Sequence, residues 1–194
     1  MGCKPKALIL GHSFVRRFQL FLDQGVDHRT LPGLNLSSVD IHFVGIGGRT
    51  VSKIFAYDLE YVRALQPEII ILEIGSNDLC EVGVRPETVG SNVESLVSTL
   101  HKVCQAAFIV VCQTIHRATL PSHCPRYNSS VDILNNYLEV VLEPLSFAVF
   151  WHHKGLRQPT VPILKRDGVH LNDHGNYALY RSYRGAILFA IQHI

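Results

Sequence analysis

The sequence predicts an α/β fold in which a five-stranded parallel sheet carries helices on both faces. Short aliphatic runs alternate along the 194 residues with longer stretches that have apolar residues at helical spacing. This alternation is typical of βαβ units, which build parallel sheets. The composition, with 47% hydrophobic and 18% charged residues, is that of a globular chain. We therefore expect a single domain over residues 1–194, a three-layer sandwich similar to flavodoxin.

The strands are predicted from short apolar runs of the length that a buried strand requires. Residues 6–11 (KALILG) form the first run, and residues 108–113 (FIVVCQ) form the fourth. The clearest run is EIIILEI at 68–74, because a nearly continuous β-branched stretch is typical of a strand buried on both faces. In chain order, the five predicted strands cover residues 6–11, 39–44, 68–74, 108–113 and 146–151.

The helices are predicted from the stretches between and after these runs, where apolar residues recur every three or four positions. We expect Asn172 or Asp173 to cap the last helix, since both side chains accept hydrogen bonds from a first helical turn. In chain order, the five predicted helices cover residues 14–24, 51–65, 86–103, 131–142 and 173–191. Ligands of such sheets bind beyond the carboxyl ends of the strands, so we expect the chemistry there.

Charge and cysteine content argue against several classes of function. A formal net charge of +2 does not indicate nucleic-acid binding, and we expect no nucleic-acid partner. The five cysteines are odd in number and form no CxxC pair, which favours a reducing, cytoplasmic location. No apolar run reaches the ~18–20 residues of a membrane span, and the N-terminus lacks a signal-peptide pattern. Met1 is the one methionine, which is consistent with a domain cut from a longer protein.

Four polar blocks follow the predicted strands or precede the last helix. They read GHS at 11–13, GIGG at 45–48, GSND at 75–78 and DGVH at 167–170. The carboxyl ends of parallel strands meet at one edge of a sheet, and ligands bind in the crevice at that edge. We therefore expect the four blocks to converge on one site.

The residue types in these blocks suit acyl transfer. The hydroxyl of Ser13 needs a base to become a good nucleophile, and His170 can be that base. Asp167 can hold the imidazole in the correct tautomer and support the imidazolium. The backbone N–H groups of Ser13 and Gly48 and the side-chain amide of Asn77 can donate to a tetrahedral oxyanion. The sequence thus predicts a serine esterase that needs no cofactor or metal and acts on a small-molecule or lipid ester.

The blocks resemble those of SGNH (GDSL-like) hydrolases in order and separation over nearly the whole chain. GHS is similar to the usual GDS, GSND to GxND, DGVH to DxxH, and GIGG to a stretch in platelet-activating-factor acetylhydrolase catalytic subunits. The resemblance implies the SGNH hydrolase fold and hydrolysis of acetyl or lipid acyl esters. It implies Ser13 as nucleophile, Asp167 and His170 as its triad partners, and Gly48 and Asn77 as oxyanion donors.

Some features leave other interpretations open. His12 stands where the family has its first-block aspartate, so a catalytically weak SGNH-like module that binds lipid or protein is the alternative function. If the match between the GIGG block and the family's conserved glycine is shifted by one residue, Gly47 is the oxyanion donor instead of Gly48. The run ALILGHSFVRR also resembles the esterase domain in the first open-reading-frame protein of some LINE-type retrotransposons. That resemblance suits a domain of a larger retroelement protein.

Plain structural interpretations accompany the functional ones. Taken alone, Ser13 can be a helix N-cap and the glycine and Asn77 blocks ordinary turns; their agreement at predicted places favours the enzyme. Four loop histidines, taken together with Cys124, lack the tight spacing of metal ligands, and so no metal site is predicted: His116, His123, His152 and His153. Four aliphatic loop residues either meet a substrate chain or pack against the sheet: Leu120, Val161, Ile163 and Leu164. The basic pairs Arg16–Arg17 and Lys165–Arg166 are expected to be solvated, with weak attraction to an anionic membrane surface as the alternative.

Overall fold

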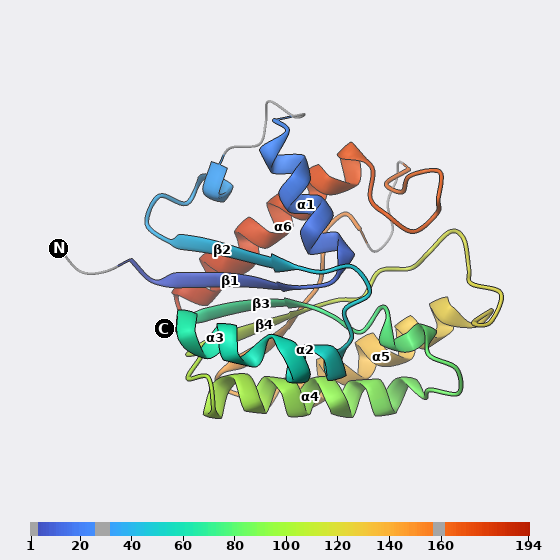
Figure 1. Cartoon of the computed structure of the whole chain (residues 1–194), viewed down its shortest axis with the longest axis horizontal. Coiled ribbons are helices and arrows are strands. Elements are labelled where there is room, and N and C mark those ends of the chain that lie inside the picture. The colour runs from blue at the N-terminus through green and yellow to red at the C-terminus, as the bar shows by residue number, and fades with distance from the viewer. Residues whose placement is uncertain (1–3, 26–31, 157–161) are drawn as a thin grey trace.

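Five parallel strands form one sheet in the computed structural model, which describes residues 4–25, 32–156 and 162–194 (Figure 1). The strand order is β2-β1-β3-β4-β5, and every pair of neighbours runs parallel. The strands are β1 (Lys6–Gly11), β2 (Asp40–Gly45), β3 (Ile69–Glu73), β4 (Phe108–Cys112) and β5 (Ala148–Trp151). The predicted sheet is confirmed. Its order reverses between β1 and β3, so a crevice is expected beyond their carboxyl ends.

Helices cover both faces of the sheet, as predicted. In Figure 1, α1 and α6 lie on one face, and α2, α3, α4 and α5 lie on the other. The helices are α1 (Ser13–Asp23), α2 (Val51–Tyr57), α3 (Leu59–Leu65), α4 (Pro86–Lys102), α5 (Tyr127–Leu142) and α6 (Asp173–Ile191). Two short 3₁₀ helices, η1 (Pro32–Asn35) and η2 (Asp78–Cys80), complete the described elements.

The core consists of two apolar layers separated by the sheet. Successive strand residues point to opposite faces, so Ala7 and Ile9 pack with α1 and α6, whereas Leu8 and Leu10 pack with the other helices. All four side chains are fully buried. This two-sided burial is why the strand sequences are nearly continuous apolar runs instead of alternating ones.

One helix expectation was wrong: residues 51–65 form two helices, α2 and α3, which meet at Asp58. The apolar periodicity continues across this position, and neither glycine nor proline marks the break. The side chain of Asp58 is buried and accepts a hydrogen bond from Nη2 of Arg49 at 2.8 Å. The break therefore accompanies a tertiary ion pair, which no local pattern announces.

The other helix boundaries deviate little from expectation. Helix α5 begins at Tyr127, four residues before the predicted start, where its buried phenol hydroxyl donates to Oγ of Ser76 at 3.1 Å. Helix α6 has the predicted bounds, and Asn172 is its cap, because its Oδ1 accepts from the Gly175 N–H at 2.9 Å. The four cysteines in the described residues are free thiols. No helix within the described ranges combines the length and apolar character needed to cross a bilayer.

Candidate active site

The N-terminus of α1 presents Ser13 directly after β1. His12 is the N-cap of this helix, and its Nδ1 accepts a hydrogen bond from the Phe14 N–H at 3.3 Å. The His12 N–H in turn donates to the carbonyl oxygen of Glu73, at 3.2 Å. Gly11 is needed at this contact, since a Cβ there would lie 2.1 Å from the same carbonyl oxygen. The contact with β3 thus fixes the position of the backbone at Ser13. This residue lies at the N-terminus of α1, which is the positive end of the helix dipole.

The DGVH block forms a tight turn in front of α6. The Asp167 carboxylate accepts at Oδ1 from the N–H groups of Val169 and His170, both at 2.9 Å. Gly168 has φ +67°, and its carbonyl oxygen accepts from Ala118 N–H at 2.8 Å, so the turn packs on the loop after β4. A Cβ at Gly168 would lie 2.1 Å from Thr119 Oγ1, which explains the glycine.

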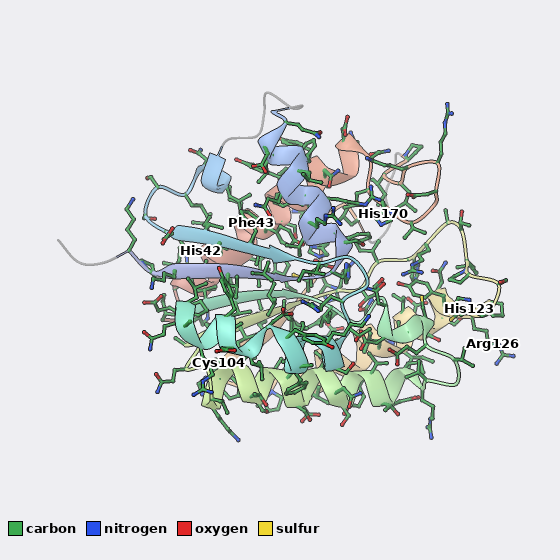
Figure 2. The ribbon with its side chains drawn as sticks, in the orientation of Figure 1. His42, Phe43, Cys104, His123, Arg126 and His170 are labelled. Atoms are coloured by element: carbon green, nitrogen blue, oxygen red, sulfur yellow. The ribbon has the colours of Figure 1, made fainter. Side chains whose placement is uncertain are left out.

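The structure brings Ser13, His170 and Asp167 into one hydrogen-bonded series. His170 Nδ1 lies 2.8 Å from Asp167 Oδ2, and His170 Nε2 lies 3.3 Å from Ser13 Oγ. Figure 2 shows His170 beside the start of α1, at the end of the molecule toward which the strand arrows point. The backbone N–H groups of His170 and Val169 hold the pKa of Asp167 well below its usual range, so this carboxyl is ionised at neutral pH.

Residues of the GIGG and GSND blocks line one cleft together with Ser13 and His170. Gly48 has φ +70°, and a Cβ at Gly47 or Gly48 would meet nothing within 4 Å, so their backbone faces open space. The side-chain amide of Asn77 donates one hydrogen bond to the Arg49 carbonyl oxygen at 2.8 Å. A primary amide has two N–H donors, and the second donates to none of the described residues, so it is available to a ligand. Both candidate glycines, Gly47 and Gly48, line the cleft.

Asp78 is a positioning residue that the sequence analysis treated only as part of a turn. Helix α2 has no side-chain cap of its own, and the Asp78 carboxylate instead accepts from the Val51 N–H at 2.9 Å. Burial raises the pKa of Asp78 to about 6. Together with the hydrogen bond from Asn77 to the Arg49 carbonyl oxygen, this contact holds the loop that contains Gly47 and Gly48 against the segment that follows β3. The adjacent Asn-Asp pair was visible in the sequence, but its partner 27 residues earlier was not.

Glu73 ends β3 as a charged residue in an otherwise aliphatic, fully buried strand. Its Oε2 accepts from the Tyr183 hydroxyl at 3.0 Å and lies 3.0 Å from His153 Nε2. Burial opposes its ionisation, but His153, His12 and the Tyr183 hydroxyl together outweigh burial and lower the pKa of Glu73. The lone acid inside an apolar run is the sequence signal from which this buried polar network could have been expected.

Glu73, Cys112 and His153 are the group of described residues whose potential ligand atoms all lie within 4.8 Å of one another. The group lies in the core and not in the cleft, and the carboxylate and imidazole already hydrogen-bond to protein partners. We interpret it as a structural network. Two of the other loop histidines pair with carboxylates, because His116 lies 2.8 Å from Asp132 and His152 lies 3.1 Å from Glu139. His123 Nε2 lies 3.1 Å from the carbonyl oxygen of Cys80.

A cleft of about 600 Å³ opens over the hydroxyl of Ser13. Its lining residues come from all four polar blocks, from α1 and from the loop after β4: Ser13, Phe14, Arg16, Arg17, Leu20, Gly47, Gly48, Ser76, Asn77, Arg117, Val169 and His170. The three aliphatic loop residues that the structure describes, Leu120, Ile163 and Leu164, do not line it. Ile163 and Leu164 pack against the core, Leu120 is partly exposed, and Val161 lies outside the described residues.

Arg117 is a lining residue that the sequence analysis missed. The side chain of Asn128 holds its backbone, accepting from the Arg117 N–H and donating to its carbonyl oxygen, both at 2.9 Å. Its guanidinium lies over the Tyr127 ring, 4.2 Å from the centroid. A single arginine in a long loop carries no sequence signal, because its place in the cleft depends on α5.

A comparison of this sequence with known protein families is consistent with the site geometry. The model of the GDSL-like lipase/acylhydrolase family matches residues 10–178, a range that contains all four polar blocks. The chain belongs to this family. No curated protein is significantly similar in sequence. Membership of this acylhydrolase family confirms the resemblance stated above at the level of family and fold.

Solved structures share the fold of this family member at low sequence identity. A GDSL-like lipase from Bacteroides thetaiotaomicron is 18% identical, with a TM-score of 0.76 over 96% of this chain and 89% of its own. A carbohydrate esterase family 3 structure from Talaromyces cellulolyticus is 13% identical, with a TM-score of 0.73 over 98% and 99%. The esterase EstA from a Pseudoalteromonas species is 16% identical, with a TM-score of 0.66 over 94% and 98%.

Proposed function

We propose that this chain hydrolyses carboxylic esters, such as acetyl or lipid acyl esters, with Ser13 as the nucleophile. The observation that carries the proposal is the hydrogen-bonded series from Ser13 through His170 to Asp167 at the cleft. Membership of the GDSL-like acylhydrolase family supports the reaction class. The apolar side chains of Phe14 and Leu20, which line the same cleft, suit the hydrocarbon part of an ester.

In the acylation step, His170 Nε2 takes the proton of the Ser13 hydroxyl while Oγ attacks the ester carbonyl carbon. The separation of 3.3 Å is slightly long for a hydrogen bond, and such catalytic contacts often tighten when substrate binds. The resulting imidazolium is stabilised by the ionised Asp167, which two backbone N–H groups hold in place. The imidazolium then protonates the leaving alcohol, and an acyl-Ser13 ester remains.

The negative oxygen of the tetrahedral intermediate is proposed to bind between the two sides of the cleft. Its donors are the N–H of Ser13 at the α1 N-terminus, the N–H of Gly48 or Gly47, and the second N–H of the Asn77 side chain. Water then attacks the acyl-enzyme with His170 as base, which releases the acid and restores the Ser13 hydroxyl. Removing one such donor costs about 10²–10³ in rate in comparable sites.

The alternative, a binding module with negligible turnover, was motivated by His12 in place of the family's aspartate. In the structure, His12 accepts the hydrogen bond from the first turn of α1, which is the task of an N-cap carboxylate. The loop that presents Ser13 therefore has its cap despite the substitution. We favour the enzyme for this reason.

Hydrolysis of para-nitrophenyl acetate and labelling by a fluorophosphonate probe test the proposal. Ser13→Ala and His170→Ala are expected to lower kcat by about 10⁴-fold or more and to abolish labelling. The matched control is Ser38→Ala, since Ser38 is exposed and lies just before the amino end of β2, whereas the cleft lies beyond the carboxyl ends of the strands. Wild-type turnover in Ser13→Ala would overturn the proposal. A folded wild-type protein with neither turnover nor labelling would favour the binding module.

A further inference from the structure

The proposed ester site lies in a cleft with a concentration of positive charge. Arg16, Arg17 and Arg117 line it, and none of the described lining residues is acidic. The whole chain has 18 basic and 16 acidic residues, so this concentration does not reflect a generally basic surface. Low-dielectric walls lined by one sign of charge focus the field into the cleft. The region around Ser13 is therefore suited to an anion.

Arg117 is fixed by neutral partners, so its charge is not cancelled by them. Its Nη2 donates to Ser76 Oγ at 3.0 Å and to the Ser76 carbonyl oxygen at 3.3 Å, and its Nη1 donates to Cys80 Sγ at 3.1 Å. A guanidinium has five N–H donors, and these contacts with described residues leave some for a ligand. A guanidinium held in one orientation binds a carboxylate with a smaller loss of side-chain entropy than a mobile one.

Arg16 and Arg17 lie near the N-terminus of α1, where cations oppose the helix dipole. The first turn of α1 contains no acidic residue that would offset them. Both side chains are exposed, and no carboxylate in the described ranges 4–25, 32–156 and 162–194 forms an ion pair with them. Helix stability does not account for this arrangement, whereas attraction of an anionic ligand does.

We propose that the cleft selects esters that carry an anionic group, with Arg117 as the fixed contact and Arg16 and Arg17 as the exposed ones. This inference rests on the proposed function, because it concerns the substrate of the same Ser13 site. A carboxylate is the simplest anionic group with which to probe it. The anion can stand on the acyl or on the alcohol side of the ester, and the two sides are distinguished by the choice of substrate.

Matched ester pairs provide the test. On the alcohol side, para-acetoxybenzoate is compared with its neutral methyl ester; on the acyl side, mono(para-nitrophenyl) adipate is compared with para-nitrophenyl hexanoate. We expect kcat/KM of wild type to favour the anionic member of at least one pair by about tenfold or more, as hydrogen bonds to charged groups usually do. The preference is expected to fall as ionic strength rises. The favoured pair shows on which side the anion binds.

Variants assign the preference to the arginines. Arg117→Gln is expected to lower the anionic-to-neutral ratio about tenfold. The exposed pair Arg16→Gln/Arg17→Gln, which should fold normally, is expected to lower it about two- to fivefold. Arg63→Gln on α3 removes the same charge outside the cleft and is the control. Arg117→Lys keeps the charge without the planar fork and should give an intermediate ratio.

Two kinds of failure can be told apart. The inference would be overturned if the anionic-to-neutral ratio of kcat/KM in wild type were near one for both pairs. It would also be overturned if this ratio were unchanged in both Arg117→Gln and the double variant. In either case, Ser13-dependent hydrolysis of the neutral esters would continue, and the proposed function would stand. Hydrolysis of all four esters that persists in Ser13→Ala would instead overturn the proposed function itself. A ratio that falls equally in Arg63→Gln would show a general charge effect and would also overturn the inference.

Discussion

Replacing His12 by asparagine is expected to remove a large part of the acid sensitivity of this fold. His12 is buried, and burial lowers its pKa from 6.5 to about 4; nearby Glu73 opposes this change, whereas Arg117 and His170 add to it. Its Nδ1 must remain unprotonated to accept from the Phe14 N–H. As the pH falls, His12 of the unfolded chain therefore binds a proton near pH 6.5, whereas His12 of the folded chain binds it only near pH 4.

The sign and size of the effect follow from this difference. Between about pH 6.5 and pH 4 the unfolded state binds more protons, so the free energy of unfolding decreases as the pH falls. Because a tenfold change in a proton-binding constant corresponds to about 1.4 kcal/mol, the full effect of His12 is about 3 kcal/mol. Between about pH 7 and about pH 4.5, most of it, about 2 kcal/mol, is expected to be lost.

Urea unfolding followed by the fluorescence of Trp151, the single tryptophan, measures this loss. His12→Asn keeps an N-cap acceptor but does not titrate, so its free energy of unfolding should fall about 2 kcal/mol less than wild type between the two pH values. Asp78, whose raised pKa acts in the opposite direction, is present in both proteins and cancels. His174→Asn, at an exposed position on α6, should behave like wild type. Equal losses in wild type and His12→Asn would refute the reasoning.

Three further predictions follow from single contacts. Asn77→Ala should lower kcat for para-nitrophenyl acetate by about 10²–10³ with little change in KM; an unchanged kcat would remove Asn77 from the oxyanion site. Gly168→Ala, which places a Cβ 2.1 Å from Thr119 Oγ1 at φ +67°, should lower both kcat and Tm, and normal activity and stability would contradict the packing of this turn. Glu73→Gln leaves His153 without its buried carboxylate and should cost about 3 kcal/mol or more, or about 6–12 °C in Tm by scanning calorimetry. A Tm within 2 °C of wild type, a margin of roughly 1 kcal/mol, would show that this buried hydrogen-bonded pair contributes little.

Much of the fold was predictable because the signals that specify it are local. Parallel strands buried on both faces must be apolar throughout, so the aliphatic runs of β1 and β3 mark them directly. The position of Ser13 after the first strand, and of Asp167 and His170 before the last helix, then follows from the rule that such sheets bind ligands at one edge. Their convergence was a prediction of topology, and it required no knowledge of individual contacts.

The features that the sequence could not reveal all depend on partners distant in the chain. The break at Asp58 accompanies an ion pair with Arg49, and the cap of α2 comes from Asp78 instead of from a neighbouring residue. Arg117 enters the cleft because Asn128 on α5 fixes its backbone.

The sequence by itself determined the family, the sheet and the side chains available for acyl transfer. Only the tertiary structure decided which of those side chains are within reach of one another, and which charge surrounds them. The physical reason is that apolar patterning acts over a few residues. Hydrogen bonds such as that between Ser13 and His170, 157 residues apart, exist only after the whole sheet has assembled.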